Sequence, residues 1–322
     1  MNTKAGGHSR KRWVVVLAAV VVFVNVLALT VGIYVQQVAT RWAILDPRKS
    51  YAELFGVSDE ELARGFDSER FSRLTKERVQ LPSAHAETIN VLLVHAPGPA
   101  RGTVLLMGGH PYVVMQVGDI FLDRGFNVLH YNTPNAKISY GYYEKYDLES
   151  VVKFAREDPR GIIGVYGMSA SAGAAVQYAA MSEGSGDVAF YVIDAGFSDL
   201  ADLFGWHFRN QVGVRTPWLV NTYATVVSYL RDGYFFGEVS PRGSIVDVRT
   251  PMLFVHGRAD TEIPYWMTEE LYNAKPGAKL LLSHDGGHGL VDARGGGGIV
   301  KNREAFGRKV DELLALAAEG GG

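Results

Sequence analysis

The chain has 322 residues, of which 47% are hydrophobic and 20% charged, a balance typical of a globular protein with a large core. A formal net charge of −2 gives no indication of a nucleic-acid partner. The absence of cysteine excludes a thiol nucleophile, a thiolate metal site and any disulfide framework.

An uncharged apolar stretch near the N-terminus, residues 13–35, predicts a transmembrane signal anchor. As a helix it would be roughly 35 Å long, enough to cross the hydrocarbon core of a bilayer. Basic residues within the preceding tail, 1–12, place that tail in the cytoplasm by the positive-inside rule and the rest of the chain outside it. The alternatives are a cleaved signal peptide, which needs a shorter apolar region and a clean cleavage site, and a buried helix.

The next segment, residues 36–76, has mixed and polar composition and is expected to be a juxtamembrane connector that packs on the following domain. Ser58 precedes Glu61 by three residues, a capping-box pattern that predicts the start of a helix. We expect residues 77–322 to form one globular domain.

Short apolar runs alternate with helical stretches through this domain. The expected strands cover residues 88–94, 103–107, 127–131, 162–166, 188–193, 252–255 and 279–282. The expected helices cover residues 114–124, 146–156, 170–181, 266–274 and 302–318. This alternation predicts an α/β fold, a mostly parallel sheet with helices on both faces, whose sites lie at the carboxyl ends of the strands.

The segment 200–246 breaks the alternation and is rich in aromatic residues. It is a candidate lid over a site. The simpler alternative is a set of helices packed on the sheet.

Two serines follow the strand expected over 162–166, where an alanine-rich helix begins. A strand that turns sharply into a helix holds its serine in a strained backbone and needs small residues two positions to either side. Ser169 has Gly167 and Ser171 there, and Ser171 has Ser169 and Gly173, so neither gives the full Gly-x-Ser-x-Gly. We favour Ser169 as the nucleophile because Gly167 directly ends the strand. The alternatives are Ser171 and a helix-capping role for both serines.

Asp260 and His288 each follow a later expected strand. An aspartate in that position can orient an imidazole and stabilise the imidazolium that forms when serine loses its proton. His288 stands in Gly286-Gly287-His288-Gly289, whose glycines let the loop bend toward a site. Either residue alone would be explained as a turn or loop residue, and Asp194 is a rival for the acid. The order serine, aspartate, histidine, each after a strand, predicts a catalytic triad.

Acyl transfer also needs two backbone N–H groups that face the developing oxyanion. We assign these to Ala170, which follows the nucleophile, and to Gly109, in the glycine pair that ends the strand over 103–107. His110 is the near alternative for the second donor. The glycine pair would equally suit a tight strand-to-helix turn with no catalytic part.

These residues resemble the α/β-hydrolase superfamily, particularly its membrane-associated serine esterases and peptidase-like members. The resemblance covers roughly residues 77–319. Its most specific part runs from Ser240-Pro241 through Pro251-Met252-Leu253-Phe254-Val255-His256-Gly257-Arg258-Ala259-Asp260 to Pro264, and Gly286-Gly287-His288-Gly289 is similar to the histidine loop of the family. Two positions depart from the pattern: serine replaces one glycine of the nucleophile motif, and Met107 replaces the histidine that often precedes the oxyanion glycine.

The residues and the resemblance together predict a serine hydrolase that cleaves an ester, or less readily an amide, through an acyl-enzyme intermediate. We expect a small-molecule or lipid-like acyl substrate, attachment to a membrane through the N-terminal helix, and no metal or organic cofactor. One alternative is acyl transfer to an alcohol or lipid by the same triad. Another is a catalytically silent fold that serves as a membrane-tethered binding module.

Overall fold

The structure is a computed structural model that describes residues 6–43, 67–107, 111–133, 138–158, 161–211, 213, 215–290 and 298–320. The chain divides into two compact units. The smaller, called here the helical unit, comprises Met1–Trp42 and Phe204–Phe236. The larger, the sheet unit, comprises Ala43–Leu203 and Gly237–Gly322. The capping box expected at Ser58 and Glu61 lies outside the described residues.

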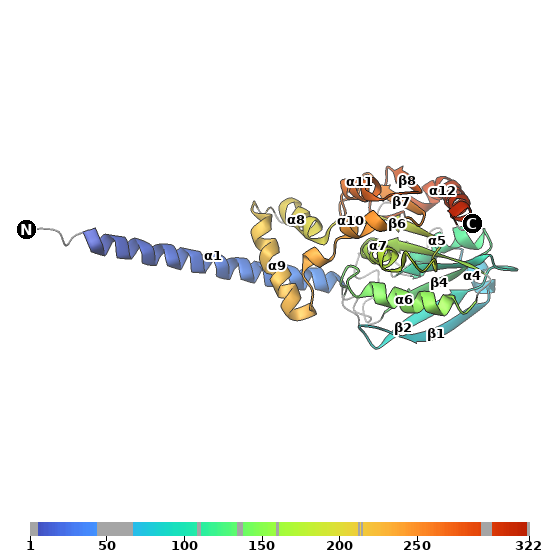
Figure 1. The fold of residues 1–322 in the computed structure, drawn as a ribbon, viewed down its shortest axis with the longest axis horizontal. Coiled ribbons are helices and arrows are strands. Elements are labelled where there is room, and N and C mark those ends of the chain that lie inside the picture. The colour runs from blue at the N-terminus through green and yellow to red at the C-terminus, as the bar shows by residue number, and fades with distance from the viewer. Residues whose placement is uncertain are drawn as a thin grey trace, which may run out of the picture. The chain divides into compact units, whose positions relative to one another are not determined.

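The sheet unit is built on one sheet, in which the described residues form eight strands in the order β1-β2-β4-β3-β5-β6-β7-β8 (Figure 1). The strands are β1 Lys76–Pro82, β2 Thr88–Val94, β3 Gly102–Met107, β4 Phe126–Asn132, β5 Ile162–Met168, β6 Phe190–Asp194, β7 Met252–Gly257 and β8 Lys279–His284. Strand β2 pairs antiparallel with β1 and β4, and all other neighbours are parallel. The mostly parallel sheet predicted from the sequence is confirmed.

Helices cover both faces of this sheet. They are α4 Ser68–Arg73, α5 Pro111–Leu122, α6 Glu144–Ala155, α7 Ala170–Ser182, α10 Pro241–Ser244, α11 Tyr265–Ala274 and α12 Gly298–Gly320, with short 3₁₀ turns η1 Phe236–Glu238 and η2 Ile245–Asp247. Successive side chains of β3 alternate between two cores: Val104 and Leu106 pack with α5 and α12, whereas Leu105 and Met107 pack with α6 and α7. A strand covered on both faces is apolar at every position, which is why β3 reads as a continuous hydrophobic run.

Strand β1 was not among the expected strands. It pairs with β2 from Lys76 opposite Val94 to Pro82 opposite Thr88, at the edge of the sheet. Only Val79 and Leu81 of β1 pack against a core, and charged or polar residues separate them. An edge strand with one solvated face alternates in this way, and the charges hid it from a search for apolar runs.

The helical unit contains α1, Gly6–Ala43, and α9, Pro217–Asp232, together with most of α8, Leu200–Asn210. Within α1, Trp13–Tyr34 is long and apolar enough to cross a membrane. The Phe204 ring stacks on Phe208 and Phe236, with ring centroids 6.3 Å and 4.7 Å apart. The aromatic segment 200–246 is therefore largely helical, and its action as a lid stays a prediction.

Candidate active site

Ser169 occupies the turn between β5 and α7, at the carboxyl end of the central strand of the sheet. Strand β5 ends at Met168 and α7 begins at Ala170, so a single residue makes the reversal. Its backbone has φ 58° and ψ −122°, a conformation that costs a residue with a Cβ of order 1–3 kcal/mol. The Ser169 side chain makes no capping hydrogen bond to the helix. The turn thus stores strain in a serine whose hydroxyl has no structural task at the helix end.

Small residues at the flanking positions have a direct steric reason. A Cβ on Gly167 would lie 2.5 Å from the carbonyl oxygen of Ser171, and a Cβ on Gly173 would lie 2.5 Å from the ring of Phe197. Ser171 itself lies inside the first turn of α7. The departure from Gly-x-Ser-x-Gly is tolerated because it is the Ser171 backbone, not its side chain, that approaches Gly167.

Asp260 and His288 meet across the turns that follow β7 and β8. The Nδ1 atom of His288 lies 2.8 Å from Oδ2 of Asp260, and the two side chains are 15% and 0% exposed. Burial works to raise the pKa of Asp260, but hydrogen bonds from His256 and His288 outweigh it and hold the pKa well below the ordinary value. Burial likewise works to lower the pKa of His288, and the hydrogen bond and charge of Asp260 raise it above 6.5. The ionised Asp260 carboxylate therefore favours the protonated form of the His288 imidazole.

His256 provides a second hydrogen bond to Asp260 that the sequence did not reveal. It is fully buried, with its Nδ1 atom 2.7 Å from Oγ1 of Thr268. Its Nε2 atom lies 2.9 Å from the carbonyl oxygen of Ile263 and 3.1 Å from Oδ2 of Asp260. Because both of these partners are acceptors, Nε2 carries the proton. The sequence shows that His256 precedes Asp260 by four residues, but this spacing alone does not predict a contact between a strand residue and a residue of the following turn.

Asp194, the rival acid, instead joins the serine turn to the histidine loop. Its buried carboxylate accepts hydrogen bonds from the hydroxyl of Tyr166, at 2.6 Å, and from the backbone N–H of Leu290, at 2.8 Å. Its backbone carbonyl accepts from the N–H of Ser169, at 2.9 Å. Leu290 follows His288 by two residues, so one aspartate holds both the Ser169 turn and the His288 loop.

The histidine loop also touches the serine turn directly. Gly289, with φ +72°, has the Met168 side chain so close that a Cβ would lie 2.7 Å from its Sδ atom. Met168 and Gly289 are the chain neighbours of Ser169 and His288. The Met168 side chain thus packs on the Gly289 backbone, at the end of the sheet where both catalytic candidates lie.

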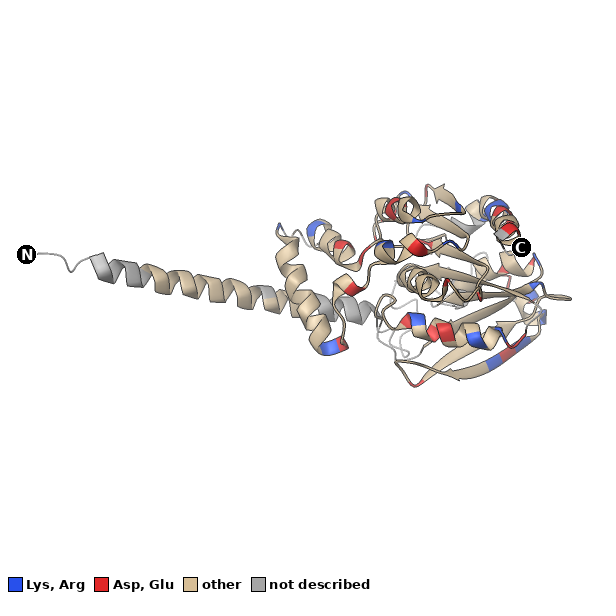
Figure 2. Ribbon diagram, in the orientation of Figure 1, with Lys and Arg blue, Asp and Glu red and all other residues tan. Residues whose placement is uncertain are grey.

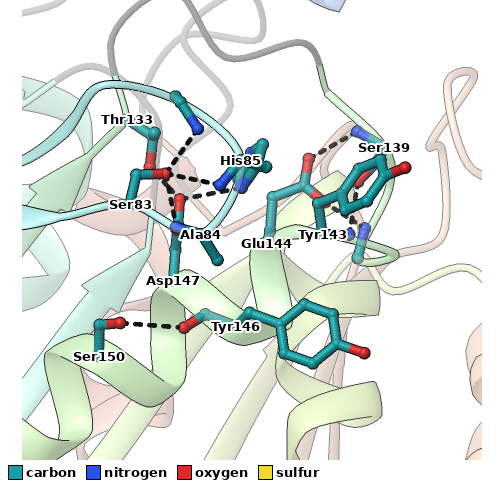
Figure 3. A network of polar contacts seen from close by, with 12 residues as sticks. Ser83, Ala84, His85, Thr133, Ser139, Tyr143, Glu144, Tyr146, Asp147 and Ser150 are labelled. Carbon is teal, nitrogen blue, oxygen red and sulfur yellow. Dashed lines mark hydrogen bonds and ion pairs between the residues drawn. The ribbon is translucent and has the colours of Figure 1, made fainter.

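Figure 3 shows a polar network that joins two acidic residues of α6 to the β1–β2 turn and to the segment after β4. Asp147 of α6 accepts hydrogen bonds from Ser83 and Thr133, and its Oδ2 lies 3.3 Å from Nδ1 of His85. Burial works to lower the pKa of His85, but the hydrogen bond and charge of Asp147 raise it. Glu144, at the start of α6, accepts hydrogen bonds from the backbone N–H groups of Ser139 and Gly141.

The loop held by Glu144 lies against α7. A Cβ on Gly141 would approach Cα of Ala174 to 2.8 Å, and the ring of Tyr140 meets Phe197 edge to face. Tyr140, Ser169 and Ala195 are the described non-glycine residues with positive φ. Ala195 directly follows Asp194, so strained backbone gathers around the serine turn, as is common at functional sites.

Of the two residues predicted to donate a backbone N–H to the oxyanion, the structure describes only Ala170. Ala170 is the first residue of α7, where the amide N–H has no partner within the helix. Gly109 and its alternative His110 lie outside the described residues. Among the side chains that the structure describes, no group of three or more His, Asp or Glu is arranged to hold a metal ion.

Known proteins resemble this chain in both sequence and fold. Residues 236–307, which carry Asp260 and His288, match the family described as TAP-like protein, of the α/β-hydrolase type. The uncharacterized protein YqkD of Bacillus subtilis (strain 168) is 32% identical over 259 residues, covering 76% of this chain and 81% of that protein. The chain belongs to the α/β-hydrolase superfamily.

Solved structures show the same fold. The Pyrococcus furiosus esterase Pf2001 superposes with a TM-score of 0.57 at 19% identity, over 77% of this chain and 94% of the esterase. The Pyrococcus horikoshii acylaminoacyl peptidase gives a TM-score of 0.56 at 13% identity, over 78% of this chain and 43% of the peptidase. The 2,6-dihydroxy-pseudo-oxynicotine hydrolase gives 0.54 at 20% identity, over 76% and 69%. The fold and superfamily predicted from the sequence are confirmed.

Proposed function

We propose that the chain is a serine hydrolase that cleaves carboxylic ester bonds, with Ser169 as nucleophile, His288 as general base and Asp260 as its orienting acid. The observation that carries this proposal is the backbone of Ser169. A serine held at φ 58° in a one-residue strand-to-helix turn, beside an aspartate-paired histidine loop, has the geometry of an exposed nucleophile. Ser171, within the helix, lacks it.

In the proposed reaction the Ser169 hydroxyl oxygen attacks the ester carbonyl carbon and its proton passes to Nε2 of His288. The tetrahedral intermediate collapses, and the protonated His288 gives that proton to the departing alcohol. Water then repeats the attack on the acyl-enzyme and regenerates the serine. The amide N–H groups of Ala170 and Gly109 hold the oxyanion in both steps.

Asp260 remains ionised throughout this cycle. Its low pKa means that it does not take the proton from His288, and its charge stabilises the imidazolium that forms as Ser169 attacks. Its hydrogen bond to Nδ1 fixes the tautomer of His288 with Nε2 free to accept. His256 and the N–H of Ile263 keep the carboxylate in place.

A fluorophosphonate probe tests the nucleophile. We expect the full-length protein to be labelled, Ser171→Ala to retain labelling, and Ser169→Ala to lose it along with hydrolysis of p-nitrophenyl esters. Loss in Ser171→Ala with retention in Ser169→Ala would move the nucleophile two residues along. No labelling of the folded wild type would contradict the proposal and favour the silent binding module.

We further propose that α1 anchors the chain in a membrane, with residues 1–12 in the cytoplasm and the sheet unit on the other side. The support is the apolar stretch Trp13–Tyr34 and the basic residues that precede it. The chain has no cysteine, so a single Val246→Cys is a unique label site. A membrane-impermeant maleimide added to intact cells should react with it, and reaction only after lysis would contradict this orientation.

A further inference from the structure

Helix α9 exposes a stripe of large apolar side chains. Trp218, Val226, Tyr229 and Leu230 are 67%, 41%, 49% and 76% exposed. Tyr229 and Leu230 follow Val226 by three and four residues, and Trp218 precedes it by eight, so at 3.6 residues per turn all four lie within about 120° of the helix circumference. The Tyr229 ring stacks on Phe235, itself 39% exposed, with ring centroids 4.3 Å apart. Contiguous exposure of this kind marks a surface that is covered in use.

No charge interrupts this stripe. Helix α9 is uncharged from Pro217 to Leu230, and its only charged residues, Arg231 and Asp232, stand at its C-terminal end (Figure 2). The stretch Trp13–Tyr34 of α1 likewise contains no charged residue. The helical unit therefore presents two neighbouring uncharged helical stretches, Trp13–Tyr34 and residues 217–230.

The two helices are in contact within the apolar span itself. Gly32 of α1 lies so close to α9 that a Cβ there would be 3.0 Å from Cβ of Tyr223 and 3.1 Å from the backbone nitrogen of Ala224. The Tyr223 hydroxyl also hydrogen-bonds the side-chain oxygen of Asn25. Seven residues separate Asn25 from Gly32, which is about 10 Å of helix rise. The middle of α9 is therefore level with the C-terminal part of Trp13–Tyr34.

We propose that α9 lies in the same bilayer as α1, at its interfacial zone, with Trp218, Val226, Tyr229 and Leu230 in contact with lipid. The proposal rests on the anchor role of α1 given above. Wherever α1 crosses a membrane, the part of α9 that packs on Gly32 and Asn25 is at membrane depth. The occupant of the apolar stripe is therefore lipid.

The chemistry of the contact agrees with this environment. A glycine allows two helices in lipid to approach closely, and a polar side chain such as Asn25 needs a partner there, which the Tyr223 hydroxyl supplies. Trp218 and Tyr229 are the residue types that favour the membrane interface. Arg231, at the end of the helix, has a side chain long enough to reach the headgroups.

Single cysteines in the full-length protein test this proposal, because the chain has none of its own. Leu230→Cys reports on α9. Leu27→Cys reports on the anchor, at a position of α1 that is 53% exposed. Val246→Cys reports on the sheet unit, at a position of η2 that is 49% exposed. Each variant carries an environment-sensitive fluorophore and is reconstituted in phosphatidylcholine vesicles. Quenching by a nitroxide-labelled lipid is compared with quenching by aqueous iodide.

We expect the fluorophores at Leu27 and Leu230 to be quenched several-fold more by the labelled lipid than the one at Val246, and several-fold less by iodide. Lipid quenching at Leu27 with a Val246-like response at Leu230 would overturn the proposal and leave the anchor intact. A Leu230 site shielded from both quenchers would also overturn it, since a protein surface would then cover the stripe. Iodide quenching at Leu27 would show that the anchor had failed, and the proposal with it.

Discussion

Replacing Gly167 with alanine should displace the backbone of the serine turn. The new Cβ would lie 2.5 Å from the carbonyl oxygen of Ser171 and 3.1 Å from Cα of Ala172. Real Cβ atoms are not found closer than 3.0 Å, so the first turn of α7 must move by at least about 0.5 Å. Both contacts are backbone, and no side-chain rotation relieves them.

The magnitude follows from two effects. Overpacking of a tight site costs roughly 1–3 kcal/mol, and a misplacement of about 1 Å near the reacting groups can cost about 100-fold in rate. With a shift of about half that size, we expect labelling by a fluorophosphonate to slow by about tenfold or more in Gly167→Ala. Gly184→Ala is the matched control, because a Cβ at Gly184 meets nothing within 4 Å.

The assay is the second-order rate constant of fluorophosphonate labelling, measured well below the thermal unfolding midpoint of each variant. The unfolding midpoint itself reports the cost in stability. Gly184→Ala should match the wild type in both measurements. If Gly167→Ala also matched it in both, the close approach of Ser171 to Gly167 would not govern the nucleophile, and the steric reasoning for Ser169 would be wrong.

Two further predictions concern the base and the aspartate that links the site. His288 must be neutral to accept a proton, and its pKa is raised above 6.5, so the labelling rate should climb with pH through a midpoint above that value. Asp260→Asn removes the charge that raises this pKa, so the midpoint of the pH profile should fall and the maximal labelling rate should drop. A midpoint that did not move would refute the pairing of Asp260 with His288. Asp194→Asn should destabilise the protein by about 1–3 kcal/mol in urea unfolding, because the N–H of Leu290 faces both carboxylate oxygens, at 2.8 Å and 3.1 Å, and the amide NH2 would put a donor in place of one of them. Tyr166→Phe should cost less, and an unfolding midpoint unchanged in both variants would contradict the linking role of Asp194.

Much of the fold could be predicted from the sequence, because buried parallel strands leave a strong local signal. Strands such as β3 and β7 are buried at every position and mostly apolar, and turn residues follow each of them. Asp260 and His288 were predicted from a similar signal, since each lies a few residues after an apolar strand segment. Strand β1, with Val79 and Leu81 set among charges, was missed because an edge strand buries only part of one face.

The nucleophile motif was nearly symmetric in the sequence, with small residues around both Ser169 and Ser171. Which serine makes the turn depends on the residue at which β5 ends and α7 begins, and secondary-structure propensity does not resolve a shift of two residues. In the structure the reversal takes place at Ser169 alone, and the Ser171 backbone fills the space beside Gly167.

By itself, then, the sequence determined the α/β class, the apolar N-terminal span and the order of serine, aspartate and histidine, because periodicity and turn chemistry are local properties of the chain. The tertiary structure alone decided that Asp194 binds the N–H of Leu290, that His256 supports Asp260, and that Tyr223 meets Asn25. Asp194 and Leu290 are 96 residues apart and Tyr223 and Asn25 are 198 apart. Contacts over such separations form only when the packed sheet and helices bring particular backbone and side-chain groups within hydrogen-bonding distance, which no local pattern encodes.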